Sequence, residues 1–323
     1  MNSPLVSAIG VVFVDCKGFA NQNYQAQTRN LGSIQFVHGG VVRNVVENLA
    51  RLSVPTSFVT MIDESAMGKE VVDKLESLHI KTNHIAYVKE KGMGWWLALL
   101  NEHGNLAGSI SQMPELSAFE DYLIRHGEEI VKNSRNLVLE LDMNYPIVKR
   151  IHDLAAKYQV PLYGIPGNLD VIMRHRDVLN GLACFICNNY EVDMLLGRDF
   201  SNQPLETKLQ LLQELVHETR LQRMIVTLGA HGAVYYDSLT GDKGHQTVFP
   251  VQLIDSSGAG DSFFSGAVAS LARGASIGEA AFVGTKVAGW TVEHPASNCP
   301  DLDVKIKNDE EVKEVLLKET VSI

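Results

Sequence analysis

The chain has 323 residues, of which 45% are hydrophobic and 20% charged, the balance of a globular protein rather than of a disordered or fibrous one. Its formal net charge of −10 argues against a nucleic-acid-binding face, although a single loop can still bind a small anion. The apolar runs fall short of the roughly 18 residues that a membrane span needs, so we expect no membrane partner.

The N-terminal apolar segment 5–14 lacks the basic region and the cleavage site of a signal peptide. The four cysteines, Cys16, Cys184, Cys187 and Cys299, are too few and too scattered for a disulfide framework, which favours a reducing cytoplasm. Cys184 and Cys187 form a C-x-x-C pair, but they lie in an apolar run without a second pair. A buried strand is therefore favoured over a zinc or redox site.

The β-branched residues at 6–14 predict a buried central strand that ends at Asp15. Ligands of open α/β sheets bind beyond the carboxyl ends of the strands, so Asp15 is a candidate for binding substrate hydroxyls. The alternative role of a strand-end aspartate is to cap a loop. Asp15 is therefore a substrate candidate that the local sequence alone does not decide.

A double-glycine turn, Gly39 and Gly40, precedes a helical pattern at 41–52. Glycines at such a turn allow the backbone to approach a ligand closely. Asn44 falls one turn inside the helix, and Asn48 follows four residues later on the same face. These asparagines are either ligand contacts or part of a solvated helix face, and their nearness to the turn favours contacts.

The segment 33–37 alternates like a short exposed strand, and 94–100 and 106–110 read as two strands joined by a hairpin turn. Together they predict a small antiparallel sheet apart from the main one. Trp95 and Trp96 then point to opposite faces of this sheet. One face would cover a ligand and the other would pair with a second subunit. The alternative is that both tryptophans fill the core.

Further strands alternate with amphipathic helices and predict an α/β fold, at 57–62, 83–88, 136–141, 161–165, 183–187 and 223–227. The strand at 136–141 ends at Asp142. The strand at 183–187 leads to Asn188 and Glu191, three residues apart at a strand-to-helix junction. Both side chains can reach a hydrated cation there, or they can simply cap the helix.

The segment 255–266 reads D-S-S-G-A-G-D-S-F-F-S-G and leads directly into an apolar helical pattern. The turn Gly258, Ala259 and Gly260 presents unpaired N–H groups at a helix N-terminus, which is an anion site. Asp261 would oppose anion binding there. We therefore predict that Asp261 is a general base for a hydroxyl that attacks a γ-phosphate. The alternative is a helix cap beside a tight turn.

Three signatures, H-G-G-V-V-R-N at 38–44, N-N-Y-E at 188–191 and D-S-S-G-A-G-D at 255–261, resemble in order and spacing the ribokinase-like (PfkB) family of carbohydrate and nucleoside kinases. Within that family, the run from Gly39 to Leu52 and the late P-D-L at 300–302 look most like pseudouridine kinases.

The resemblance covers residues 1–323 and implies a single domain, a three-layer α/β/α sandwich. A small β-sheet lid would be inserted near 15–37 and 93–111, and in this family the lid often forms a dimer contact. Met93 to Trp96 replaces a lid stretch that is usually smaller and more polar, and 164–168 lacks an aspartate often found there. We expect these departures to affect which substrate is bound rather than the phosphoryl-transfer chemistry.

The resemblance also implies roles for individual residues. Asp261 corresponds to the catalytic base of the family. The family's anion hole corresponds to Gly258, Ala259 and Gly260. Substrate contacts match Asp15, Gly39, Gly40 and Asn44, to which we add Arg43 as a planar partner for a base edge and Asp142 at a strand end. The nucleotide side matches Asn188, Thr227, Gly229 and Gly232. Asn188 and Glu191 correspond to the family motif that binds magnesium through water molecules. Asp255 and Ser257 correspond to positions associated with a monovalent cation.

We therefore expect an ATP- and Mg²⁺-dependent kinase, with K⁺ as a further candidate ion, that phosphorylates a primary hydroxyl. Two lid tryptophans suit a flat base, so a pseudouridine-like nucleoside is predicted ahead of a sugar of the ribose or fructose type. The alternative from another class is a catalytically silent relative that binds a metabolite. A homodimer through the lid is the expected assembly.

Overall fold

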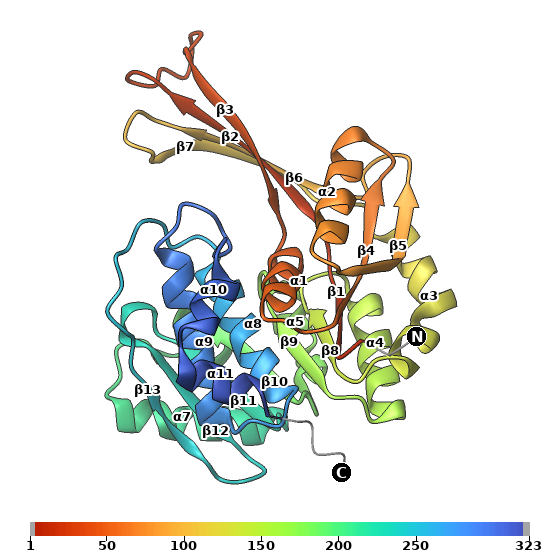
Figure 1. The fold of residues 1–323 in the computed structure, drawn as a ribbon, viewed down its shortest axis with the longest axis vertical. Helices are drawn as coiled ribbons and strands as arrows, with labels where there is room; N and C mark the ends of the chain where they lie inside the picture. Colours follow the sequence, from red (N-terminus) through yellow and green to blue (C-terminus); the bar gives the residue numbers. More distant parts are fainter. Residues whose placement is uncertain (1–3, 319–323) are drawn as a thin grey trace.

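The computed structural model describes residues 4–318, and its largest element is a nine-stranded sheet (Figure 1). The strands are β1 (Val6–Ile9), β4 (Thr56–Asp63), β5 (Lys81–Val88), β8 (Leu137–Glu140), β9 (Leu162–Ile165), β10 (Cys184–Asn188), β11 (Arg223–Thr227), β12 (Ala233–Asp237) and β13 (Lys243–Gln246). Their order is β13-β12-β11-β10-β9-β8-β1-β4-β5. From β11 to β5 every pairing is parallel, and only β12 and β13 are antiparallel.

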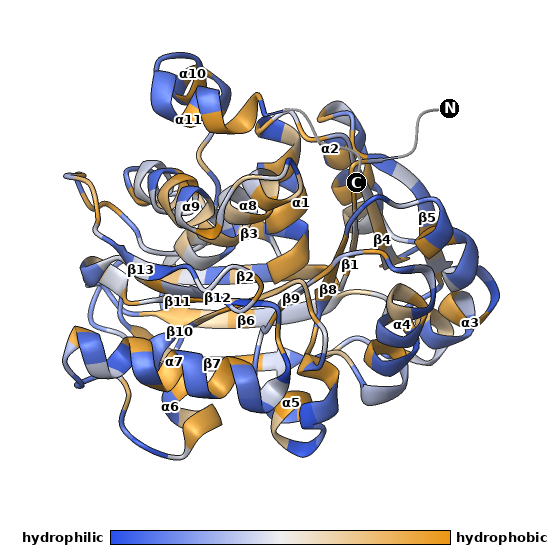
Figure 2. Cartoon of the chain, turned by 90° about the horizontal axis from the view of Figure 1, so that it is seen from below, coloured by the Kyte–Doolittle hydropathy of each residue, from blue (hydrophilic) through white to orange (hydrophobic). Residues whose placement is uncertain are grey.

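Helices cover both faces of this sheet, which confirms the predicted three-layer α/β/α sandwich (Figure 2). One layer contains α1 (Val41–Arg51), α8 (Ala259–Leu271) and α9 (Ile277–Val292), and the other contains α3 (Ser117–Lys132), α4 (Tyr145–Tyr158) and α7 (Leu205–Thr219). Neighbouring residues of β4 divide between the layers, because Phe58 packs into one core and Val59 into the other. This two-sided burial explains the nearly continuous apolar strands.

Shorter elements complete the chain: α2 (Ala66–Ser77), α5 (Asp170–Arg174), α6 (Asn189–Leu196), α10 (Leu302–Lys307), α11 (Glu310–Leu316) and the 3-10 turns η1 (Arg176–Leu179) and η2 (Gly229–His231). Among residues 4–318, no helix is both long and apolar enough to cross a membrane.

A second, four-stranded sheet projects from the body of the molecule (Figure 1). It consists of β2 (Phe13–Ala20), β3 (Gly32–Gly39), β6 (Gly94–Leu100) and β7 (Leu106–Gln112), in the order β3-β2-β6-β7. We call this sheet the lid. It is mixed rather than antiparallel as predicted, because β2 and β6 pair in parallel.

The predicted strand at 6–14 is wrong in one respect, since β1 ends at Ile9 and the chain continues into the lid as β2. The break falls at Gly10, where a Cβ atom would lie 2.4 Å from Glu140 Oε2 and 2.6 Å from Val42 Cβ. Only glycine fits such a crossing. Asp15 therefore belongs to the lid rather than to the end of a central strand.

Candidate active site

A pocket of about 630 Å³ opens where the lid meets the large sheet and α8. Its walls include eight of the residues that the sequence nominated: Asp15, Gly39, Gly40, Asn44, Asp142, Ser257, Gly258 and Asp261. These residues come from the lid, from α1, from the end of β8 and from the N-terminus of α8. The chain thus brings together segments that are more than two hundred residues apart.

The turn before α8 requires glycine for two reasons. Gly258 is the N-cap and has a φ of 75°, in the left-handed region. A Cβ atom on Gly258 would also lie 2.1 Å from the carbonyl oxygen of Ser297. Ala259 and Gly260 follow in the first turn, so their end of α8 directs its positive dipole toward the pocket.

Asp261 lies in this first turn and accepts a hydrogen bond from Asn44 Nδ2 at 2.7 Å. Burial raises the pKa of Asp261 to about 6, and the Asn44 hydrogen bond and the nearby Arg43 charge oppose part of that rise. A carboxylate with such a pKa is mostly ionised at neutral pH and still basic enough to take a proton. This is the environment that a general base needs.

Arg43 was predicted to face the substrate, but its side chain lies beneath the pocket and is only 6% exposed. It donates hydrogen bonds to Glu47 Oε2 at 2.7 Å, to the carbonyl of His38 and to Asn44 Oδ1. Because a guanidinium can only donate, Asn44 must turn its oxygen to Arg43 and its NH₂ group to Asp261. Arg43 therefore orients Asn44, the hydrogen-bond partner of Asp261.

Three polar residues that the sequence reasoning missed support this arrangement. Ser262 accepts hydrogen bonds from Asn48 and from Thr291, both at 2.9 Å, which ties α8 to α1 and α9. Asn298 donates to the backbone oxygen of Asn44 at 3.0 Å. Ser262 is adjacent to Asp261 in sequence, but nothing local marks Thr291 or Asn298. These bonds hold in place the two helices that carry Asp261 and Asn44.

The double-glycine turn is as tight as its sequence indicates. Gly40 is the N-cap of α1 with a φ of 101°, and a Cβ atom there would lie 2.6 Å from Val11 O. A Cβ atom on Gly39 would lie 2.9 Å from Asp15 Oδ1. Burial raises the pKa of Asp15, while the charges of Lys17 and Arg43 lower it. Asp15 thus lies directly against the turn, at the pocket wall.

Glu140 also lines the pocket, although the sequence reasoning took it for part of a buried strand. Its Oε2 accepts a hydrogen bond from Val11 N at 2.8 Å, and burial raises its pKa well above the usual value. The sequence feature that indicates a site residue here is a charged glutamate within the apolar run L-V-L-E-L. Asp142 follows, held by Gly167 N at 3.0 Å and Asn168 Nδ2 at 2.9 Å.

The two lid tryptophans separate as the alternation of a strand requires. Trp96 lines the pocket together with Phe13 and Met113. Trp95 instead packs against the core cluster that contains Met93 and the apolar residues of α1. Only Trp96 is thus placed to cover a ligand.

Asn188 and Thr227 lie side by side, because they are register partners at the ends of β10 and β11. Asn188 Oδ1 accepts from Glu191 N at 2.9 Å, and Glu191 Oε2 accepts from Asn188 N at 2.7 Å. This capping box starts α6, so the capping role is present. Burial raises the pKa of Glu191, with the Asp142 charge adding to the rise.

The residues predicted to bind the nucleotide and a monovalent cation, apart from those of β10, β11 and α6, lie in turns or loops. Gly229 and Gly232 have φ angles of 56° and 87° in the turn between β11 and β12, and a Cβ atom on Gly232 would lie 1.9 Å from Gln246 O. Asp255 Oδ1 accepts a hydrogen bond from Ser257 N at 2.8 Å. Asp255 thus braces the loop before α8, while Ser257 reaches the pocket.

The PfkB family model, described as the pfkB family carbohydrate kinase, matches residues 3–303. The chain belongs to the PfkB family of carbohydrate kinases. As a member of this family of sugar and nucleoside kinases, it is a phosphotransferase with an alcohol group as acceptor. The predicted family and enzyme class are therefore confirmed.

Two curated relatives of this PfkB kinase act on nucleosides by name. It is 34% identical over 287 residues to the guanosine-inosine kinase of Exiguobacterium acetylicum, covering 89% of this chain and 94% of the relative. It is 24% identical over 300 residues to the pseudouridine kinase of Escherichia coli, covering 93% and 94%. Arabidopsis thaliana ribokinase, solved with ribose and ATP, has the same fold, with a TM-score of 0.79 and 20% identity over 98% of this chain and 99% of the ribokinase chain.

Proposed function

We propose that this PfkB kinase transfers the γ-phosphate of ATP to the primary hydroxyl of a nucleoside. The observation that supports a nucleoside over a free sugar is the pocket itself. Trp96, Phe13 and Met113 form an apolar part of its wall, and Asp15 and Asn44 form a polar part. A flat base can stack on an aromatic ring, whereas a free pentose has no such surface to offer.

Among nucleosides, a purine nucleoside of the guanosine or inosine type is our first candidate. The support is the 34% identity to guanosine-inosine kinase over 89% of the chain, against 24% to pseudouridine kinase. The sequence prediction of a pseudouridine-like substrate stays as the second candidate. Asp15 and Asn44 would bind ribose hydroxyls in either case.

In the proposed reaction, Asp261 takes the proton from the primary hydroxyl as that oxygen bonds to the γ-phosphorus of ATP. The bond between the γ-phosphorus and the oxygen that bridges it to the β-phosphate breaks, and ADP leaves. The N–H groups of Gly258, Ala259 and Gly260 stabilise the charge on the transferred phosphoryl group. Asn44, oriented by Arg43, keeps the carboxylate of Asp261 in place. Positioning and charge stabilisation account for most of the catalysis in phosphoryl transfer.

The residues at β10 and α6 fit a hydrated magnesium ion. Asn188 and Glu191 offer amide and carboxylate oxygens, the donors that Mg²⁺ prefers, and the capping box holds both side chains in fixed rotamers. When bound, magnesium would neutralise charge on the nucleotide phosphates. We place the nucleotide near Thr227, Gly229 and Gly232, and a monovalent cation beside Asp255 and Ser257.

The lid is our proposed dimer contact. Its surface exposes large apolar side chains, including Ile34 and Ile110, each 69% exposed, and Phe36, 57% exposed. Light scattering on the purified protein should give twice the mass of one chain. Phe36→Glu should give a monomer, and a monomeric wild type would refute the contact.

The deciding experiment is a phosphorylation screen by mass spectrometry with ATP and magnesium. The acceptors are guanosine, inosine, pseudouridine, uridine, adenosine, ribose and fructose. We expect the highest kcat/KM with guanosine or inosine. A higher value for ribose or fructose would overturn the nucleoside assignment and leave the kinase chemistry intact. Saturable binding without any phosphorylated product would instead indicate a silent metabolite-binding relative.

A further inference from the structure

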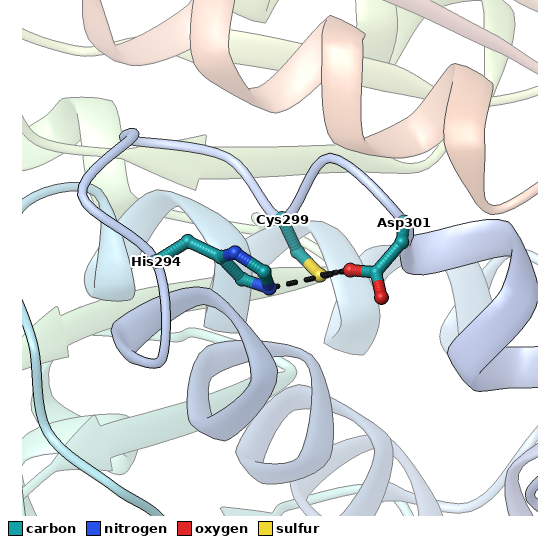
Figure 3. A group of neighbouring side chains, drawn as sticks. All are labelled: His294, Cys299 and Asp301. Carbon is teal, nitrogen blue, oxygen red and sulfur yellow. Dashed lines mark hydrogen bonds and ion pairs between the residues drawn. The ribbon is translucent and has the colours of Figure 1, made fainter.

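Three chemically different side chains converge on the loop between α9 and α10 (Figure 3). His294 Nε2 lies 3.2 Å from Asp301 Oδ1, and Cys299 Sγ lies 3.2 Å from the same oxygen. The three donor atoms all lie within 4.8 Å of one another. The proposed reaction uses none of these residues.

The spacing suits a tetrahedral metal ion. Bonds of about 2.0–2.3 Å to imidazole, thiolate and carboxylate place the donor atoms of a tetrahedral site roughly 3.3–3.8 Å apart. Two of the three separations, each 3.2 Å, are already close to that range, and the third is at most 4.8 Å. One nitrogen, one sulfur and one oxygen donor select a borderline-soft ion such as Zn²⁺ over Mg²⁺, which prefers oxygen alone.

The exposure of the three side chains and the charges around them also fit a bound metal ion. The side chains of His294 and Asp301 are 28% and 46% exposed, so an ion can enter from solvent and keep water as a fourth ligand. Cys299 is fully buried, which shields the sulfur from bulk oxidants. Lys305, a cation near Asp301, forms an ion pair with Glu293 at 3.2 Å, which partly neutralises it.

The same loop contacts the active site at two points. Asn298, next to Cys299, donates to the Asn44 backbone oxygen, and the carbonyl of Ser297 lies against Gly258. On the other side, Arg51 Nη1 donates to the carbonyl of Pro300 at 2.7 Å. A metal that joins the end of α9 to the start of α10 would therefore stiffen the segment that packs under the anion hole and α1.

We propose that His294, Cys299 and Asp301 form a structural binding site for a Zn²⁺-type divalent cation, distinct from the magnesium of the kinase reaction. On binding, the Cys299 S–H bond breaks, a metal–sulfur bond forms and the proton leaves to solvent. In the metal-free protein the thiol donates its hydrogen to Asp301, and burial with that bond raises the pKa of Cys299 to about 12.

The first test is titration of EDTA-treated protein with Zn²⁺ by calorimetry, and with Co²⁺ by absorption spectroscopy. We expect one ion per chain and a thiolate-to-cobalt charge-transfer band. Cys299→Ser should weaken Zn²⁺ binding at least tenfold and abolish the band. Cys16→Ser, which alters a cysteine of the lid, is the matched control and should bind as wild type. An unchanged affinity in Cys299→Ser, or no saturable binding by wild type, would overturn the proposal.

Two further measurements distinguish metal ligation from a fold defect. His294→Ala alters a partly exposed side chain, so it should melt like wild type in EDTA but lose the Zn²⁺-induced rise in melting temperature. Because one proton is released, Zn²⁺ affinity should rise about tenfold for each pH unit between pH 7 and pH 9. A Zn²⁺ effect on melting that persists in His294→Ala, or an affinity that ignores pH, contradicts this site.

Discussion

Asn44 Nδ2 lies 2.7 Å from Asp261 Oδ2, although the two residues are separated by 217 positions in the chain. Asn44 belongs to α1, after the double-glycine turn, and Asp261 lies in the first turn of α8, after the N-cap Gly258. The bond joins the substrate side of the pocket to the proposed catalytic base. It also lowers the pKa of a carboxylate that burial would otherwise raise further.

Asp261→Asn should lower kcat by a hundredfold or more, because the amide keeps the shape of the carboxylate but cannot take a proton. ATP affinity, measured by calorimetry, should stay within about threefold of wild type. Asp73→Asn, at an exposed position of α2, is the control and should leave kcat unchanged. A wild-type rate in Asp261→Asn with ATP bound would remove Asp261 from the mechanism.

The pH profile should report the same carboxylate. The base works only when ionised, so kcat/KM should fall as the pH drops through about 6. Asn44→Ala removes a hydrogen bond that lowers this pKa, so the midpoint should move upward. Asn48→Ala, one turn later, breaks the bond to Ser262 instead and should leave the midpoint in place. A midpoint that is identical in wild type and Asn44→Ala contradicts this account.

The raised pKa of Asp261 also has a cost in stability. The pKa is about 6 in the folded protein against 3.8 for the ordinary group, so the folded state loses stability as the pH rises from about 4 to 6. This difference between the two pKa values corresponds to a loss of up to about 3 kcal/mol in the free energy of unfolding at pH 8. Asp261→Asn should therefore unfold at a higher urea concentration than wild type at pH 8. The difference should vanish near pH 4, and equal stability at both pH values would refute the raised pKa.

Glu47 neutralises two arginines below the pocket. Its carboxylate lies 2.7 Å from Arg43 and 2.9 Å from Arg51, and its side chain is only 8% exposed. Glu47→Gln leaves the buried Arg43 charge uncompensated and should destabilise the protein by about 3 kcal/mol in urea unfolding. Glu115→Gln breaks an exposed pair with Lys91 and should cost less than about 1 kcal/mol. Equal losses in the two variants would contradict the difference in burial.

Trp96→Leu should raise KM for the nucleoside by about tenfold, because the stacking surface for the base is lost. The KM for ribose, if ribose is turned over at all, should change much less, since a free pentose has no flat ring. Comparing the two acceptors in one variant controls for any general effect on the lid. A parallel rise in both KM values would show that Trp96 supports the fold of the pocket rather than the base.

The sequence by itself determined most of the helices and strands and the glycine turn at the start of α8. The βα rhythm predicted an α/β fold, and Gly258 to Asp261 are contiguous, so a single local segment specifies both the helix N-terminus and its carboxylate. Strand alternation likewise placed Trp95 and Trp96 on opposite faces. Such features depend on neighbours in the chain, and periodicity records them.

Only the tertiary structure decided which side chains face the pocket. The sequence predicted Glu140 as part of an apolar strand and Arg43 as a substrate contact, yet Glu140 lines the pocket and Arg43 lies beneath it. Asp15 was predicted at the end of a central strand but lies in the lid strand β2. The central strand β1 already ends before Gly10, whose backbone passes too close to Glu140 for a residue with a Cβ atom. These placements depend on contacts between segments more than a hundred residues apart, and local sequence patterns contain no record of those contacts.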